Sequence, residues 1–202
     1  PARSEMCIRD SNKTIHLAGG CFWGMQGYFN RIRGVMGTKV GYANGKGDST
    51  NYESVKETDH AETVEITYDK SLVSLEEILL RYFKVIDPKS VNKQGGDRGR
   101  QYRTGIYYSD PADKKIIDKV YKYEEKIHGE LAVDVEELKN FVLAEGYHQD
   151  YLEKNPGGYC HINLAEADEP IFEKEYKEVS DEEAKKLLDE LSYKVMREEG
   201  TE

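Results

Sequence analysis

The segment of this chain best suited to chemistry is 20–24, Gly-Cys-Phe-Trp-Gly, which sets the thiol of Cys21 beside the only tryptophan. Residues 14–18 favour a short strand, and Met25 and Phe29 recur at helical spacing after it. A cysteine at such a strand-to-helix turn meets the unpaired N–H groups and the positive dipole end of the helix, which stabilise a thiolate. The ordinary alternative is an inert, buried cysteine. The flanking glycines argue against it, so we predict a reactive thiol at Cys21.

One class of thiol chemistry is hydrolysis or acyl transfer. It would need a histidine as the base for Cys21, and His148 or His60 could take that role. Neither spacing is diagnostic of such an enzyme, so this class stays open as the alternative.

Redox chemistry at Cys21 has different requirements. It needs an apolar seat for the substrate, a proton donor and a second thiol that clears the oxidised product. Phe22 and Trp23 offer the seat, Glu62 offers the carboxyl group, and Cys160 follows a glycine-rich turn near the end of the chain. The redox interpretation uses more of the sequence and is the one we favour.

Composition excludes several other classes of function. The chain has 202 residues and a formal net charge of −10, and the part from Glu166 onward, with 14 acidic and 6 basic residues, carries most of it. No basic stripe is present, so nucleic acid and anionic membrane surfaces are not expected as partners. The three cysteines are too scattered for a disulfide framework, and the histidines lack metal-ligand spacing, so we expect no metal and no bound cofactor.

Apolar runs and targeting segments bear on the location of the protein. No apolar run is long enough to span a bilayer, and no signal peptide is evident in the numbered sequence. We expect a cytoplasmic protein. A secreted or periplasmic one stays an alternative, because the sequence begins at Pro1 rather than at a methionine.

The periodicity predicts an α+β protein. Alternation over 62–68 places Val64, Ile66 and Tyr68 on one face of a half-buried strand, with Glu62 at its mouth. Ser74 with Glu77 forms a capping box that opens a helix. Further strands are expected at 35–42, 104–108 and 132–138, and further helices near 111–128, 147–153 and after residue 180. These elements fit layers around one largely antiparallel sheet.

The ordered motifs of the chain resemble those of the A-type peptide methionine sulfoxide reductases. The matching segments are 20–24 (GCFWG), 41–42 (GY), 51–55 (NYESV), 60–62 (HAE), 68–69 (YD), 95–97 (GGD), 101–103 (QYR), 147–152 (YHQDYL) and 155–160 (NPGGYC). The resemblance implies a two-layer α+β sandwich with a ferredoxin-like core, spanning residues 1–165. It also implies reduction of the S epimer of methionine sulfoxide, free or in oxidised proteins and peptides.

The resemblance assigns a role to each matching site residue. Cys21 is the nucleophile that becomes a sulfenic acid, Glu62 protonates the sulfoxide oxygen, and Cys160 resolves the sulfenic acid to a disulfide that thioredoxin reduces. The remaining site positions are the phenols Tyr52 and Tyr102, the aspartate Asp97 and the methyl-binding wall Phe22 and Trp23. Cys7 has no counterpart and is expected to be a bystander.

Some positions depart from the family pattern. Asp59, Gly96 and Ile86 stand where glycine, asparagine and histidine are common. Residues 166–202 read as an acidic linker and a helix resembling the start of a B-type reductase domain, which suggests a fused enzyme. The alternative for this tail is an amphipathic helix that packs on its own domain or on a neighbour.

Overall fold

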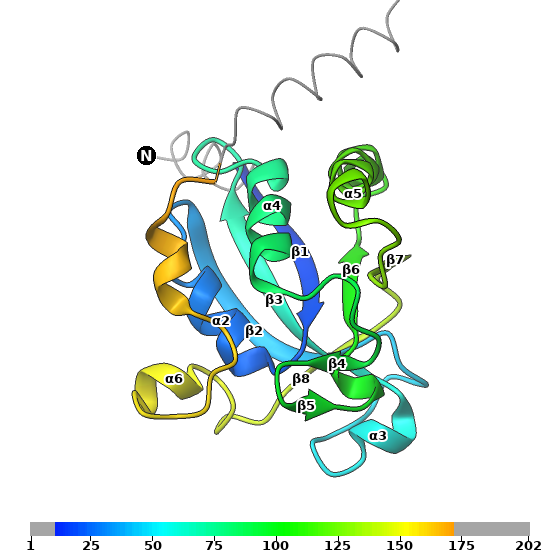
Figure 1. Ribbon diagram of the computed structural model, residues 1–202. Coiled ribbons are helices and arrows are strands. Elements are labelled where there is room, and N and C mark those ends of the chain that lie inside the picture. The colour runs from blue at the N-terminus through cyan, green and yellow to red at the C-terminus, as the bar shows by residue number, and fades with distance from the viewer. Residues whose placement is uncertain (1–10, 172–202) are drawn as a thin grey trace, which may run out of the picture.

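A six-stranded sheet forms the centre of the computed structural model, which describes residues 11–171 (Figure 1). Its strands lie in the order β7-β6-β1-β3-β2-β8. All neighbours are antiparallel except β6 and β7, which are parallel. The bounds are β1 (Asn12–Gly19), β2 (Val35–Ala43), β3 (Ala61–Asp69), β6 (Thr104–Tyr108), β7 (Asp134–Glu137) and β8 (Phe141–Leu143). The sheet is therefore mixed and largely antiparallel, as predicted.

The connections between the strands give a ferredoxin-like core. Along the chain β1, α2, β2, β3, α4 and β6 follow one another, and the four strands pair in the antiparallel order β6-β1-β3-β2. The longer helices are α2 (Phe22–Phe29), α4 (Leu75–Val85) and α5 (Asp113–His128). The shorter elements are α3 (Val55–Thr58), β4 (Lys93–Gln94), β5 (Asp97–Arg98), η1 (Arg100–Tyr102), α6 (Tyr151–Lys154) and η2 (Leu164–Asp168).

One face of the sheet carries the main core. Val64, Ile66 and Tyr68 of β3 are buried there together with residues of α2, α4 and α5. In Figure 1, α2 and α4 lie across this face. Because side chains alternate along a strand, Glu62 shares the face of Val64 and lies at the end of β3 that meets the start of α2. The predicted alternation is confirmed, and it places a carboxyl group inside the apolar layer.

The predicted start of α4 is also confirmed. The Ser74 hydroxyl accepts a hydrogen bond from the Glu77 backbone N–H at 3.1 Å. The Glu77 carboxylate does not return to Ser74 but pairs with Arg81 one turn further on. Only half of the capping box forms, because an i,i+4 ion pair competes for the same carboxylate.

The structure differs from the sequence-based expectation in two segments. The helix expected at 147–153 is reduced to the four residues of α6, with turns before it. Residues 89–103, where the sequence predicts no helix or strand, contain β4, β5 and η1. Cys7 and the helix expected after residue 180 lie outside the described residues. Within residues 11–171, no helix is long and apolar enough to span a bilayer.

Candidate functional site

Cys21 is the N-cap residue of α2, directly after the end of β1. Gly20 makes the turn with φ +84°, a conformation that favours glycine. The Cys21 side chain is buried and makes no capping hydrogen bond, although the backbone N–H groups of Trp23 and Gly24 lie near enough to its sulfur to lower the pKa of the thiol in part. Burial and the nearby Glu62 charge nonetheless raise the pKa of this thiol, and the two N–H groups only partly offset the rise. The expectation that the helix terminus yields a thiolate is wrong for the resting protein, because desolvation outweighs it.

Glu62 is the acid of the site. Its carboxyl Oε2 accepts a hydrogen bond from the Phe22 backbone N–H at 3.1 Å, and only 2% of the residue is exposed. Burial raises the pKa of Glu62 to about 8, the Phe22 bond lowers it in part, and the charge of Asp97 raises it further. An ordinary glutamate is ionised at neutral pH, whereas this one holds its proton and can donate it.

Tyr102 and Asp97 face this acid from η1 and β5. Burial, followed by the charges of Glu62 and Asp97, raises the pKa of Tyr102, so its phenol remains a hydrogen-bond donor. Burial, followed by the Asp97 carboxyl group, raises the pKa of the Tyr159 phenol. The Oδ2 atom of Asp97 is buried and has no hydrogen-bond partner within the described part of the chain. The site therefore holds an unused acceptor beside a protonated acid and a phenol.

Two aromatic residues follow Cys21, and the structure places them differently. Phe22 belongs to the main core and is 1% exposed. Trp23 is only partly buried, and its ring stacks on Tyr151 with centroids 3.7 Å apart and an interplanar angle of 12°. The Trp23 indole Nε1–H donates to His148 Nδ1 at 3.1 Å. Tyr151 and His148 thus hold the Trp23 ring in one orientation. The local sequence around Trp23 does not indicate either partner, because both are distant in sequence.

Tyr52 lies at the rim of the site rather than inside it. It is 48% exposed, and its ring centroid is 5.1 Å from that of His148. Its backbone N–H donates to the Glu145 carboxylate at 2.8 Å, and the Tyr42 phenol donates to the same carboxylate. Glu145 therefore fixes the loop that carries Tyr52. Sequence analysis had assigned no role to Glu145.

The geometry does not support the hydrolase alternative. His148 Nδ1 already accepts the Trp23 indole proton. The His60 ring bonds to Thr58 through Nδ1 and to the Gly47 carbonyl through Nε2. Among residues 11–171, neither histidine makes a hydrogen bond with Cys21, so the nucleophile–base pair that such an enzyme requires is not formed.

Cys160 lies beside the first turn of α2. Its thiol donates to the Ile162 carbonyl at 3.1 Å. A Cβ atom added to Gly24 would lie 3.2 Å from Cys160 Sγ, so the absence of a side chain at Gly24 makes room for the thiol. Both Cys21 and Cys160 are free thiols. The fold thus brings two cysteines that are distant in sequence to the same end of one helix.

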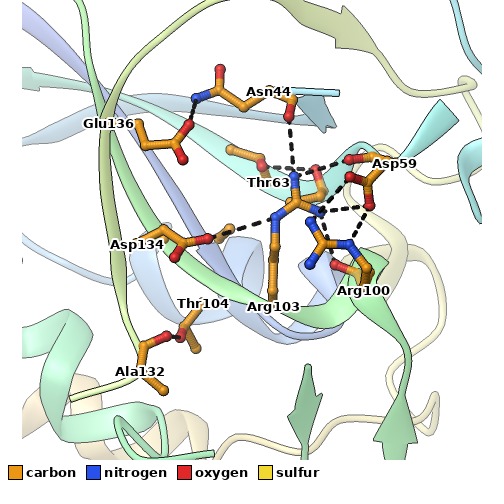
Figure 2. Close-up of polar contacts among 12 residues, drawn as sticks. Asn44, Asp59, Thr63, Arg100, Arg103, Thr104, Ala132, Asp134 and Glu136 are labelled. Carbon is orange, nitrogen blue, oxygen red and sulfur yellow. Dashed lines mark hydrogen bonds and ion pairs between the residues drawn. The ribbon is translucent and has the colours of Figure 1, made fainter. Parts of the chain in front are cut away.

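A polar cluster supports the site from the side of β3 and η1 (Figure 2). The Arg103 guanidinium donates to the carbonyl oxygens of Arg100, Asn44 and Asp59 at 2.9, 3.1 and 3.0 Å. The Arg100 side chain in turn pairs with the Asp59 carboxylate. Asp59 has φ +56°, which explains why glycine is common at this position. The cluster joins the residues that precede Glu62 to the turn that ends in Tyr102.

The described residues contain no group of three or more His, Cys, Asp or Glu side chains that could hold a metal ion.

Comparisons with known proteins show which family and which solved structures this chain is similar to. The profile of the peptide methionine sulfoxide reductase family matches residues 13–180. Reduced Mxr1 from Saccharomyces cerevisiae is 36% identical with a TM-score of 0.73, covering 77% of this chain and 93% of Mxr1. Methionine sulfoxide reductase A of Corynebacterium diphtheriae is 32% identical with a TM-score of 0.69, covering 74% of this chain and 78% of its own. Mxr1 in complex with Trx2 is 26% identical with a TM-score of 0.52, covering 70% of this chain and 86% of Mxr1.

Proposed function

This chain belongs to the peptide methionine sulfoxide reductase family, and we propose that it reduces the S epimer of methionine sulfoxide, free or in proteins, with Cys21 as the nucleophile. One observation carries the proposal. Glu62, a carboxyl group with a pKa of about 8, is bonded to the N–H of the residue next to the buried Cys21 thiol. The choice of the S epimer rests on the resemblance of the motifs to the A-type enzymes.

The first step joins Cys21 to the sulfoxide oxygen. Glu62 protonates that oxygen, the Cys21 sulfur takes it up as the sulfur–oxygen bond of the substrate breaks, and methionine leaves. The thiol proton of Cys21 passes to the carboxylate that Glu62 has become. Thiol and sulfoxide are thereby converted to sulfenic acid and thioether, with no other reductant consumed. In this proposal the phenol of Tyr102 donates a hydrogen bond to the same oxygen, and Trp23 receives the methyl group.

The second step releases water. The Cys160 sulfur attacks the Cys21 sulfur, the S–OH bond breaks, and the hydroxyl group leaves with the Cys160 thiol proton. An external dithiol then reduces the disulfide. The structural likeness to Mxr1, which has been solved in complex with Trx2, supports a thioredoxin in that role.

The function is tested by incubating the protein with each epimer of a methionine sulfoxide peptide and dithiothreitol. We expect the S epimer alone to be consumed. Equal consumption of both epimers, or of neither, would overturn the proposal. Cys21→Ser serves as the inactive control, because a hydroxyl is a far poorer nucleophile at sulfur.

Cys160→Ser tests the resolving role. It should release about one equivalent of methionine per protein and then stop when thioredoxin is the reductant, because the first step does not use Cys160. Full turnover with thioredoxin in this variant would remove Cys160 from the pathway and direct attention to Cys7.

We also propose that residues 166–202 are a linker and a helix resembling the start of a B-type domain, and that they take no part in S-epimer reduction. Every residue that this proposal assigns to the chemistry lies at or before Cys160, although Ala167 and Ile171 still pack into the main core. Deleting residues 180–202 should therefore leave turnover nearly unchanged. Severe loss in a truncated protein that remains folded by circular dichroism would show that this segment contributes to the site.

A further inference from the structure

The residue that follows Cys160 is bonded to the strand that leads to Cys21. His161 Nε2 lies 3.0 Å from the carbonyl oxygen of Gly19, the last residue of β1. We propose that His161 is a positioning residue for the Cys21–Cys160 disulfide: it holds the Cys160 segment against the turn that carries the nucleophile. This inference rests on the proposed function and extends its second step.

The space for the His161 ring is provided by glycines. A Cβ atom added to Gly95 would lie 2.9 Å from His161 Cβ, and one added to Gly20 would lie 3.2 Å from Nε2. One added to Gly24 would lie 3.4 Å from the ring atoms Cε1 and Nδ1. The ring is therefore enclosed by the turn before Cys21, the first turn of α2 and the turn between β4 and β5. All three segments border the site, so the ring occupies a defined place relative to Cys21.

The hydrogen-bond partner fixes the tautomer of the ring. A carbonyl oxygen can only accept, so Nε2 carries the proton and Nδ1 keeps a lone pair. Burial lowers the pKa of His161, while the Gly19 bond and the charge of Asp97 raise it in part. The Asp97 carboxyl group of β5 acts on the ring, and the Cys160 thiol and the Tyr159 phenol lie next to the same glycines as the ring does. At neutral pH the His161 ring is uncharged, so its hydrogen bond to the Gly19 carbonyl joins two neutral groups.

The state of Nδ1 shows that stability alone does not account for this histidine. Nδ1 is buried and has no hydrogen-bond partner in the described part of the chain. A buried polar atom left unpaired costs at least as much free energy as one neutral hydrogen bond returns. An apolar ring would fill the same space without that cost. Packing alone therefore does not explain a histidine at position 161. The hydrogen bond from His161 to Gly19 does, because this bond links the Cys160 segment to the turn that carries Cys21.

Such a link affects one chemical step and not the other. The Cys160 segment follows the glycine pair at 157–158, where the backbone is least restricted. Attack of Cys160 on the Cys21 sulfenic acid depends on the two sulfur atoms being held near each other, and a displacement of about 1 Å can cost about 10²-fold in rate. Methionine release precedes this attack and does not use Cys160.

The test separates the two steps in a single turnover of the full chain. The reduced protein is mixed with one equivalent of an S-epimer peptide. Methionine release is followed by rapid quench, and disulfide formation is followed by the loss of free thiols and of dimedone-reactive sulfenic acid. The variants are His161→Phe, which fills the space without a donor, and His161→Gln, whose amide N–H can reach the Gly19 carbonyl. His128→Phe, at the end of α5 and away from the site, is the matched control.

In His161→Phe we expect methionine release to persist and disulfide formation to slow by about 10²-fold. In His161→Gln we expect most of the rate to return, and in His128→Phe no change. Disulfide formation at the wild-type rate in His161→Phe would overturn the proposal, as would an equal slowing of both steps. If the phenylalanine variant does not fold, His161→Asn takes its place, since its shorter amide cannot reach Gly19. Failure of the proposed function would look different, because unmodified protein would then release no methionine.

Discussion

The Glu62 carboxyl group accepts its hydrogen bond from the backbone N–H of Phe22, the residue directly after Cys21, at 3.1 Å. The proton donor is thus attached to the same turn that carries the nucleophile. The bond anchors the buried Glu62 side chain to the backbone of this turn, which limits the rotamers that the side chain can adopt. The bond itself favours the ionised carboxylate, but burial acts more strongly in the opposite direction, and the pKa stays at about 8.

Glu62→Gln should slow methionine release in a single turnover by about 10²–10⁴-fold, because an amide keeps the shape of the side chain but is not a useful proton donor. In the unmodified protein the same rate should fall as pH rises through about 8, where Glu62 loses its proton. Rapid-quench measurements across pH would show both effects. Glu65→Gln, on the opposite face of the same strand, is the control. A wild-type rate in Glu62→Gln at every pH would transfer the role to Tyr102.

The same carboxyl group should make folding stability depend on pH. The folded pKa of Glu62, about 8, lies above the ordinary value of 4.5, so the fold favours the protonated form. The stability that Glu62 contributes is fully present below about pH 4.5 and is lost as pH rises through about 8. Relative to Glu62→Gln, the free energy of unfolding of the unmodified protein should fall by a few kcal/mol across this window. Denaturant titrations at several pH values measure the difference, and parallel pH curves for the two proteins would contradict it.

Local patterns were enough to predict the parts of the fold that local physics controls. The alternation over 62–68 identified β3 and the face on which Glu62 lies, and Ser74 identified the start of α4. The glycines around Cys21 indicated a turn, and the structure places Cys21 at a helix N-cap. Each of these depends on neighbours within a few residues.

Other features arise only from contacts across the fold. The raised pKa of the Cys21 thiol comes chiefly from burial, which no segment of sequence displays. The partners of Trp23 lie more than 120 residues away, and His148 had been considered only as a base. The expected helix at 147–153 gives way to turns in which His148 and Gln149 bond to other elements. Tertiary contacts there outweigh helix propensity.

The stacking of Trp23 on Tyr151 should be measurable in substrate binding. Tyr151→Leu removes a stacked ring 3.7 Å away, an interaction that contributes about 0.5–1.5 kcal/mol. We expect the KM for an S-epimer peptide to rise by about 2–10-fold with a smaller effect on kcat, and the fluorescence of the single tryptophan to change. Tyr151→Phe retains the stack and should behave like the unmodified protein. An unchanged KM in Tyr151→Leu would mean that Trp23 does not need this support.

Asp59→Gly should leave the protein close to its original stability. The substitution relieves a left-handed backbone conformation at φ +56°, removes the ion pair with Arg100, whose side chain is 59% exposed, and removes a longer ion pair of 3.9 Å with Arg103. An exposed ion pair contributes only about 0–1 kcal/mol. Because the Arg103 guanidinium bonds to the backbone carbonyl of residue 59, that contact survives the substitution. The free energy of unfolding, measured by thermal denaturation, should differ from that of the unmodified protein by no more than about 1 kcal/mol, and the turnover rate by no more than about twofold. A larger loss of turnover would assign a direct role to the Asp59 carboxylate.

Arg103→Met should be far more damaging than Asp59→Gly, although neither side chain is placed to touch the substrate. Arg103 is 7% exposed, and its loss removes the guanidinium donor from the carbonyl oxygens of Asn44, Asp59 and Arg100, of which Arg100 keeps only the bond from the backbone N–H of residue 103. We expect a loss of about 2–4 kcal/mol in unfolding free energy and a fall in single-turnover rate of more than about tenfold, because η1 and Tyr102 would no longer be held against β3.

Arg103→Lys should recover little, since one ammonium group cannot reproduce the planar fork that reaches three carbonyl groups. Chemical denaturation and rapid-quench assays on the three variants provide the comparison, and an Arg103→Met protein that folds stably and releases methionine at the original rate would show that the cluster does not position Tyr102.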